Sequence, residues 1–360
     1  MFTNKEAVLN YFDVNRSKLP FETRIADATK LPGGYTNFVF RLRFEDNSTA
    51  VLKYYVSWTI QLNNVASKKR VSQNYLSEKR ALQLLSDTSK HFGMIRAPKL
   101  YSFDDDLFYL IMEDCGDERA VTLTDMLSNK YQLPDSLNTG DEKKNNKIVE
   151  NFLKRLAADL RKFTHNIANL SPETHGTDFR SSQFWIDRSQ AYYLLIREVA
   201  NDLDMQKELE PFYDLTFEQP TTDAHFVHGD LWPNGIIIDM ERNRAWIIDW
   251  EMARFDEEFT DFNELCYYLW LMDKRNDLLN NQRVNLLLRA LQFNYLGDES
   301  ADWKLNNPTN VLKNVLRLLL TSYNTREYLV DPFKIVSYKR YFRKFLNEYY
   351  SLKKNLISLI

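Results

Sequence analysis

The stretch HFVHGDLWPNGIIIDMERNRAWIIDWE, residues 225–251, decides the fold of this chain. Its apolar runs at 236–238 and 245–248 flank a polar segment at 239–244. Two short apolar runs joined by a polar turn predict a β-hairpin. The hairpin is a β-island in a helical region, because helical periodicity covers residues 148–163, 190–210, 261–271, 284–296, 311–323 and 338–352.

Three carboxylates stand at the ends of this predicted hairpin. Asp230 precedes its first strand, and Asp249 and Glu251 follow its second. Because an antiparallel hairpin brings its outer ends together, we expect all three at one end of the sheet. Crowded carboxylates need a cation, and hard oxygen ligands suit Mg²⁺. A surface hairpin with solvated acidic ends is the plain alternative, but the joint occurrence of His-Gly-Asp and Ile-Asp-Trp-Glu favours a site.

The first 115 residues are mostly β in character. Strands are predicted over 24–31, 38–45 and 49–56, a helix over 68–87, and a hairpin from 99–103 and 108–113. The segment Pro32-Gly33-Gly34-Tyr35-Thr36-Asn37 joins the first two strands. A glycine-rich turn lets backbone N–H groups approach phosphate oxygens, although Gly-Gly also occurs in ordinary hairpin turns.

A lysine and a glutamate on the apolar faces of two neighbouring elements form a candidate ion pair. Strand alternation places Lys53 on one face with Val51 and Tyr55. On the predicted helix, Glu78 lies on the stripe of apolar residues. A buried carboxylate without a partner is costly, so Lys53 is its expected partner. A gatekeeper lysine on an edge strand and a mis-phased helix end are the alternatives.

The order of these motifs, together with the Met112-Glu113 connector, resembles the aminoglycoside phosphotransferase and choline kinase superfamily of small-molecule kinases. The resemblance covers residues 25–270. It implies an α+β, protein-kinase-like fold of two lobes. The β-rich N-lobe, residues 1–115, would bind the nucleotide. The mainly helical C-lobe, residues 116–360, would hold the catalytic-loop hairpin and the substrate.

The resemblance also implies a role for each matching residue. The loop over the ATP phosphates would be Gly33, Gly34, Thr36 and Asn37. Lys53 would bind the α- and β-phosphates and pair with Glu78, while Val51 would cover the adenine. The connector whose backbone binds the adenine edge would be Met112, Glu113 and Asp114.

In the C-lobe, Asp230 would be the catalytic aspartate that accepts the proton of the acceptor hydroxyl or orients that hydroxyl, and Asp249 would ligate Mg²⁺. His228 is expected to support the loop, and Asp261 to brace it. One departure concerns the metal. The family usually has a metal-binding Asn five residues after the catalytic Asp, where this chain has Gly235. Either Asn234 reaches the metal, or Glu251 compensates, or the ligand is lost.

Composition limits the classes of function. The 360 residues suggest two domains. A net charge of −3 offers no basic field for nucleic acid. No apolar run reaches the ~20 residues of a membrane helix, and the N-terminus lacks the apolar core of a signal peptide. Two cysteines favour a reducing, cytoplasmic setting. Oligomeric state is not indicated.

The sequence thus predicts an ATP- and Mg²⁺-dependent kinase that phosphorylates a hydroxyl of a small molecule, such as an amino alcohol, a sugar or an aminoglycoside. The alternative is an inactive relative that binds nucleotide or a partner protein. Protein kinases are disfavoured because His-Arg-Asp and Asp-Phe-Gly are missing. Two groups of residues could contact the substrate. Helix aromatics could form a box around a quaternary amine, although such residues more often pack in the core: Trp185, Tyr192, Tyr193, Tyr267, Tyr268 and Trp270. The acidic residues Asp256, Glu257 and Glu258 could contact a cationic substrate, although a solvated turn is their more usual role.

Overall fold

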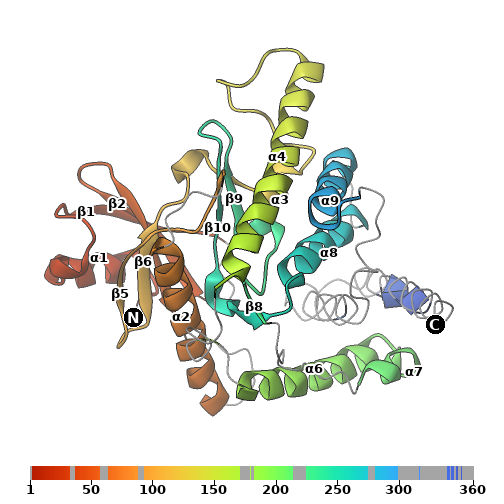
Figure 1. Cartoon of the computed structure of the whole chain (residues 1–360). Coiled ribbons are helices and arrows are strands. Elements are labelled where there is room, and N and C mark those ends of the chain that lie inside the picture. Colours follow the sequence, from red (N-terminus) through yellow and green to blue (C-terminus); the bar gives the residue numbers. More distant parts are fainter. Residues whose placement is uncertain are drawn as a thin grey trace.

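The computed structural model describes residues 2–32, 37–56, 64–87, 93–170, 182–213, 224–274 and 280–298, and a few isolated positions beyond these ranges. A β-rich part with helix α2 lies on one side of the molecule, and the long helix α4 stands beside it with α8 and α9 (Figure 1). This is the predicted division into a β-rich N-terminal region and a helical C-terminal region.

The N-terminal sheet has five antiparallel strands in the order β1-β2-β3-β6-β5. Their bounds are Ile25–Lys30, Asn37–Phe44, Thr49–Tyr55, Tyr109–Glu113 and Leu100–Asp104, respectively. All five strands were predicted. Their side chains alternate between the two faces of the sheet. In β2, for example, Phe40, Leu42 and Phe44 are buried on one face.

A helix that the sequence analysis missed covers this buried face. Helix α1, Lys5–Val14, begins at Asn4, whose side chain accepts a hydrogen bond from the Ala7 N–H (2.9 Å). Phe12 on this helix stacks on Phe2 and meets Tyr109 of β6 edge to face, each at a centroid distance of 5.7 Å. The short 3₁₀ helix Arg16–Lys18 follows. These aromatic contacts close the outer side of the sheet.

The other face of the sheet looks toward α2, Asn64–Asp87, which begins earlier than predicted. After α2 the chain crosses to a second sheet. There β4, Ile95–Arg96, runs parallel to β10, Arg244–Ile247. Buried Asp159 of α4 accepts a hydrogen bond from the Met94 N–H (3.0 Å) beside this strand. A segment from the N-terminal 115 residues is therefore built into the C-terminal sheet.

The predicted hairpin forms the centre of that second sheet, whose order is β4-β10-β9-β7. Strand β9, Ile236–Asp239, pairs antiparallel with β10 and with β7, Val121–Thr122. A smaller pair consists of β8, His225–Val227, and β11, Arg254–Asp256. Strand β11 was not predicted, because three residues give no measurable alternation.

Helices make up most of the other described residues. Their bounds are α3 Leu123–Met126, α4 Glu142–Ala168, α6 Ser182–Asp202, α7 Gln206–Leu209, α8 Thr260–Lys274 and α9 Asn281–Leu296. The short 3₁₀ helices are Asp117–Arg119, Glu210–Phe212, Pro233–Gly235 and Trp250–Met252.

Two of the predicted helical boundaries were wrong. The segment 129–147, expected to be irregular, contains the first turns of α4, because Asp141 caps the helix by accepting from the Lys143 N–H (2.9 Å). The single helix expected over 190–210 is divided, since Asp204 takes a positive φ of 49° between α6 and α7. Of the helix predicted over 311–323 only Leu316 is described, and of the helix predicted over 338–352 the described residues are 339, 340, 342, 343, 346, 347 and 350; all of these positions are helical. Among the described helices, none is long and apolar enough to cross a membrane.

The α1 contacts predict a measurable contribution to stability. Phe12→Ala removes a buried ring packed against two aromatic side chains, so we expect it to lower the free energy of unfolding by about 3 kcal/mol. Val14→Ala on the same helix is the control, because Val14 is 80% exposed. Urea unfolding followed by tryptophan fluorescence measures both. Equal midpoints for the two variants would contradict the packing of α1 on the sheet.

Candidate active site

The inner face of the N-terminal sheet carries the residues that the sequence singled out. Cross-strand pairing sets Asn37 opposite Tyr55, Val39 opposite Lys53, and Arg41 opposite Val51, so these six side chains share one face. Core residues such as Leu52 occupy the other face. The inner face is the one that reaches the C-terminal region, since the Asn37 side-chain amide donates to Glu251 (2.9 Å).

Lys53 lies at the centre of this face, among carboxylates from both halves of the chain. Its ammonium donates to Glu78 Oε2 of α2 (2.6 Å), which confirms the predicted pair. It also contacts Asp249 directly and lies 3.7 Å from Glu251. Burial on its own lowers the pKa of Lys53, but the charges of Asp249, Glu78 and Glu251 outweigh burial and raise it.

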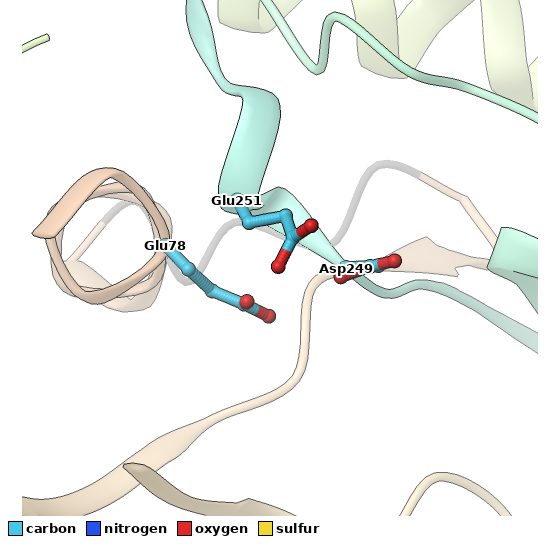
Figure 2. A group of neighbouring side chains, drawn as sticks. All are labelled: Glu78, Asp249 and Glu251. Atoms are coloured by element: carbon cyan, nitrogen blue, oxygen red, sulfur yellow. The ribbon is translucent and has the colours of Figure 1, made fainter. Parts of the chain in front are cut away.

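Glu78, Asp249 and Glu251 form a carboxylate cluster in which one ligand oxygen from each lies within 4.8 Å of the others. Figure 2 shows Glu78 reaching from its helix toward Glu251, with Asp249 beside them. Burial and the charge of Asp249 raise the pKa of Glu251 to about 7, although Lys53 works in the opposite direction. Burial would also raise the pKa of Asp249, but the adjacent Lys53 ammonium holds it below its ordinary value.

This donor set fits a divalent cation. Three carboxylates face one ammonium, so the fully ionised cluster carries an excess of negative charge. Carboxylate oxygens are the ligands that Mg²⁺ takes in proteins. The Asp249 side chain is 37% exposed, which leaves it open to an incoming ion, whereas Glu78 is buried against Lys53. Asp249 and Glu251 are therefore the residues best placed to hold the metal.

Asp249 is set by an unusual backbone conformation. It follows β10 and takes a left-handed φ of 70° at the start of the turn Trp250–Met252. Asp and Asn adopt this region more readily than most residues. Trp250 anchors the turn, because its buried indole N–H donates to the Ile247 carbonyl (2.8 Å). Helix α2, which carries Glu78, packs directly against this turn.

Asp230 lies outside the carboxylate cluster but is tied to it through His228. The Asp230 N–H donates to His228 Nδ1 (3.3 Å), and His228 Nε2 donates to the carbonyl of Ile248 (2.9 Å), the residue before Asp249. These bonds fix the imidazole as the Nε2–H tautomer. His228 is buried against Trp250, with ring centroids 4.6 Å apart. Its geometry agrees with the expected supporting role.

Asp261, at the start of α8, holds the loop from the other side. One of its carboxylate oxygens accepts from the His228 N–H and the other from the Gly229 N–H, both at 2.8 Å. Burial raises the pKa of Asp261, while these N–H donors and His228 work against that change. The expected bracing role of Asp261 thus has a direct structural basis.

A buried arginine completes the support of the loop, and sequence reasoning missed it. Arg254 donates to the Gly229 carbonyl (2.6 Å) and makes a two-point contact with Asp256 (2.8 and 2.7 Å). Glu264, also buried, lies 3.9 Å away. Asp256 is therefore neither a solvated turn residue nor open to substrate. Glu258 is paired with Arg161 (3.7 Å), and Glu257 is exposed.

The two residues that bear on the missing metal-binding Asn lie in the turn Pro233–Gly235. Asn234 is exposed there. Gly235 lies beneath Trp232, since a Cβ on Gly235 would be 3.0 Å from the indole Cδ1. A side chain at position 235 therefore requires Trp232 to move. Asn234 stays a candidate ligand beside Asp249 and Glu251, the two carboxylates that the structure brings together.

The connector uses its side chains for structure, and part of its backbone is also bonded, since the Glu113 N–H donates to the Lys99 carbonyl (2.8 Å). Glu113 accepts from the Trp246 indole N–H (3.3 Å) and from the Lys99 N–H (3.1 Å). Asp114 pairs with Arg41 (2.8 Å). Met112 is buried and pairs across the sheet with Val51. The loop residues Gly33, Gly34 and Thr36 lie outside the described residues.

The aromatic residues considered for substrate binding divide between core and surface. Tyr267 is buried and stacks on Trp270 with centroids 5.8 Å apart, which favours the core interpretation. Tyr193 is 38% exposed and lies beside Arg197. The ring centroid of Tyr268 lies 6.0 Å from that of Trp232. Trp232 follows Asp230 closely in the sequence. The side chain of Trp185 lies outside the described residues.

Asp261 and Arg254 hold the backbone of Gly229 from both sides, so we expect one added methyl group at this position to destabilise the protein strongly. Gly229 has a φ of +80°, and a Cβ there would lie 2.0 Å from the Arg254 guanidinium and 2.4 Å from the Met252 carbonyl. Gly140 has a similar φ of +73° with nothing within 4 Å, so it is the matched control. We expect Gly140→Ala to cost about 1 kcal/mol from backbone strain. Gly229→Ala should cost about 3 kcal/mol or more. Thermal unfolding compares the variants, and similar melting temperatures would contradict the close packing of Arg254 and Met252 on Gly229.

The comparisons with known proteins agree with this geometry. Residues 27–295 match the phosphotransferase enzyme family. No curated protein matches the sequence. Among solved structures, the amicoumacin kinase hAmiN, in complex with AMP-PNP, Ca²⁺ and Ami, is 13% identical with a TM-score of 0.56, covering 94% of this chain and 93% of that one.

Two further structures share the fold. Wild-type aminoglycoside 2'-phosphotransferase-IIIa in its GDP complex is 16% identical with a TM-score of 0.53, over 94% of this chain and 98% of that one. A putative aminoglycoside phosphotransferase from Ralstonia eutropha JMP134 is 14% identical with a TM-score of 0.53, over 97% and 98%. With three quarters of its length matched by the family and the same fold in these kinases, the chain belongs to the phosphotransferase enzyme family.

Proposed function

We propose that this chain transfers the γ-phosphoryl group of ATP to a hydroxyl group of a small molecule, with Mg²⁺ as the cofactor. Membership of the phosphotransferase family supports the reaction class. The observation that carries the proposal is the position of Lys53, which lies in one cluster with Glu78, Asp249 and Glu251. A cation for phosphate oxygens and carboxylates for a metal are the parts that phosphoryl transfer needs.

We assign nucleotide binding to the lobe of residues 1–115. In this proposal Lys53 leaves Asp249 to contact the α- and β-phosphates and stays bound to Glu78. Val51 covers one side of the adenine, and the backbone of Met112–Asp114 meets its edge. The loop from Gly33 to Asn37 lies over the phosphates, as the resemblance implies. The interlobe hydrogen bond from Asn37 to Glu251 supports this, because Asn37, at the end of that loop, contacts one of the two proposed metal ligands.

The C-lobe, residues 116–360, supplies the metal ligands and the catalytic aspartate. When bound by Asp249 and Glu251, Mg²⁺ supplies positive charge that offsets the charge of the phosphate oxygens. Asp230 orients the acceptor hydroxyl and takes its proton as the oxygen–phosphorus bond forms and ADP leaves. The His228 and Asp261 contacts hold the Asp230 loop against the residue before Asp249, which keeps donor and acceptor sites in register.

The proposed acceptor is defined by its chemical class. Structures of the same fold include an amicoumacin kinase and an aminoglycoside 2'-phosphotransferase. We therefore propose a small hydroxyl-bearing molecule such as an amino alcohol, a sugar or an aminoglycoside-like compound. The alternative, an inactive protein that binds nucleotide or a partner, is favoured by one observation: the position where the family usually has its second metal ligand is Gly235, and a Cβ there would lie 3.0 Å from the indole of Trp232, which would have to shift.

Asp249→Asn tests the metal site and the alternative together. Asn keeps the left-handed backbone but lowers the negative charge, so we expect it to abolish the Mg²⁺-dependent part of ATP binding. Saturating ATP with Mg²⁺ should stabilise the wild type by ~2.7 kcal/mol at 100 times the dissociation constant. Differential scanning fluorimetry with and without Mg²⁺ measures the shift. Asp135→Asn, at an exposed position, is the control for charge. A wild type indifferent to Mg²⁺ would favour the inactive alternative.

Asp230→Asn separates chemistry from binding. The substitution removes the proton acceptor and leaves the ATP and metal residues in place, so we expect phosphoryl transfer to fall at least a hundredfold. The melting shift with ATP and Mg²⁺ should stay near the wild-type value. ADP release in the presence of a panel of small alcohols measures transfer. A matching loss of nucleotide binding would assign Asp230 to the nucleotide site instead.

A further inference from the structure

Tyr55 touches both members of the Lys53–Glu78 pair. It is the last residue of β3, two positions after Lys53 and on the same face of the sheet. Its hydroxyl donates to Glu78 Oε2, the same oxygen that accepts from Lys53 (2.6 Å). Its ring centroid lies 5.2 Å from the Lys53 ammonium, within the range of a cation–π contact. Nothing in the motif pattern assigns a role to this side chain.

Lys53 has three carboxylates within reach, so its ammonium can pair with more than one of them. In the structure it contacts Glu78 and Asp249 and lies 3.7 Å from Glu251. The proposed function requires Asp249 and Glu251 for the metal. Once they bind an ion, Glu78 is the carboxylate left to hold Lys53. A glutamate side chain has three rotatable bonds, so one ion pair does not fix the position of its carboxylate.

We propose that Tyr55 is a positioning residue, whose hydroxyl fixes the Glu78 carboxylate so that Lys53 stays aligned on the phosphates while Asp249 is free for the metal. This inference rests on the proposed function. The tyrosine is suited to the task because it has few rotatable bonds and is 2% exposed. Tyr75 of α2 packs against it edge to face, with centroids 5.5 Å apart. The hydroxyl is therefore held at a fixed place.

The hydrogen bond of the Tyr55 hydroxyl also has a purely structural explanation, because buried polar groups generally find a partner. The chain offers a matched control that separates the two explanations. Tyr75 is fully buried beside Tyr55, and its hydroxyl donates to Asp105 (2.7 Å), which is not a member of the cluster. Tyr55→Phe and Tyr75→Phe each remove one oxygen from neighbouring buried rings. Of these two hydroxyls, Tyr55 supplies the one bonded to Glu78.

Steady-state kinetics of the full chain with MgATP tests the proposal, using the best acceptor from the alcohol panel. We expect Tyr55→Phe to lower kcat about tenfold, the effect of one charge-assisted hydrogen bond, with the KM for the acceptor unchanged. Tyr75→Phe should stay within about twofold of the wild type. Melting temperatures check that both variants fold. Equal kinetic losses in the two variants, or no loss in Tyr55→Phe, would overturn the proposal.

A double-mutant cycle shows whether Tyr55 acts through Glu78. In a Glu78→Gln background, Tyr55→Phe should cause no further fall in kcat, because the carboxylate it positions is already gone. Additive losses would contradict the proposal. A wild type that binds MgATP but transfers phosphate to no acceptor would overturn the proposed function and the positioning role with it. An active wild type with an insensitive Tyr55→Phe overturns the positioning role alone.

Discussion

One ammonium group among three carboxylates is the constraint on which the rest of this structure depends. Lys53 reaches Glu78, Asp249 and Glu251, which come from a helix in one lobe and a turn in the other. Charges at a largely buried site must be paired, because uncompensated burial costs several kcal/mol. The two lobes are thus held in one relative arrangement by the need to neutralise this site. The same excess of carboxylates is what a divalent cation would offset.

Contacts around the site fix the positions of the Asp230 loop and of the turn that holds Asp249. The Asp230 loop is fixed at Gly229 from both sides, by Asp261 on the N–H and Arg254 on the carbonyl. Helix α2, which carries Glu78, packs against the turn that holds Asp249, and the strand after it joins the sheet that ends at Asp249. Such rigid support is what catalysis by positioning requires, because the protein supplies geometry and charge rather than covalent chemistry.

Prediction succeeded where the signal was local and periodic. Alternation identified the five strands of the first sheet, and the stripe of α2 placed Glu78 inward toward Lys53. It failed where an element is too short for a period or depends on distant partners. Strand β11 has three residues, and α1 is ordered by aromatic contacts to Tyr109, nearly a hundred residues away. Arg254 carried no signal, because a lone arginine in a sequence is usually solvent-exposed.

Periodicity along the sequence placed Lys53 and Glu78 on the apolar faces of a strand and a helix, and motif spacing placed Asp230, Asp249 and Glu251 at the ends of one hairpin. The fold class and the expected roles of these residues came from the resemblance to a family, which the order of the motifs along the chain carries. Only the tertiary structure decided which carboxylates gather. Glu78 joins Asp249 and Glu251, whereas Asp230 stands apart and is linked through His228. It also decided that Tyr55 and Arg254 belong to the site and that Asp256 does not face solvent. These choices depend on how separate elements pack, which spacing along the chain does not encode.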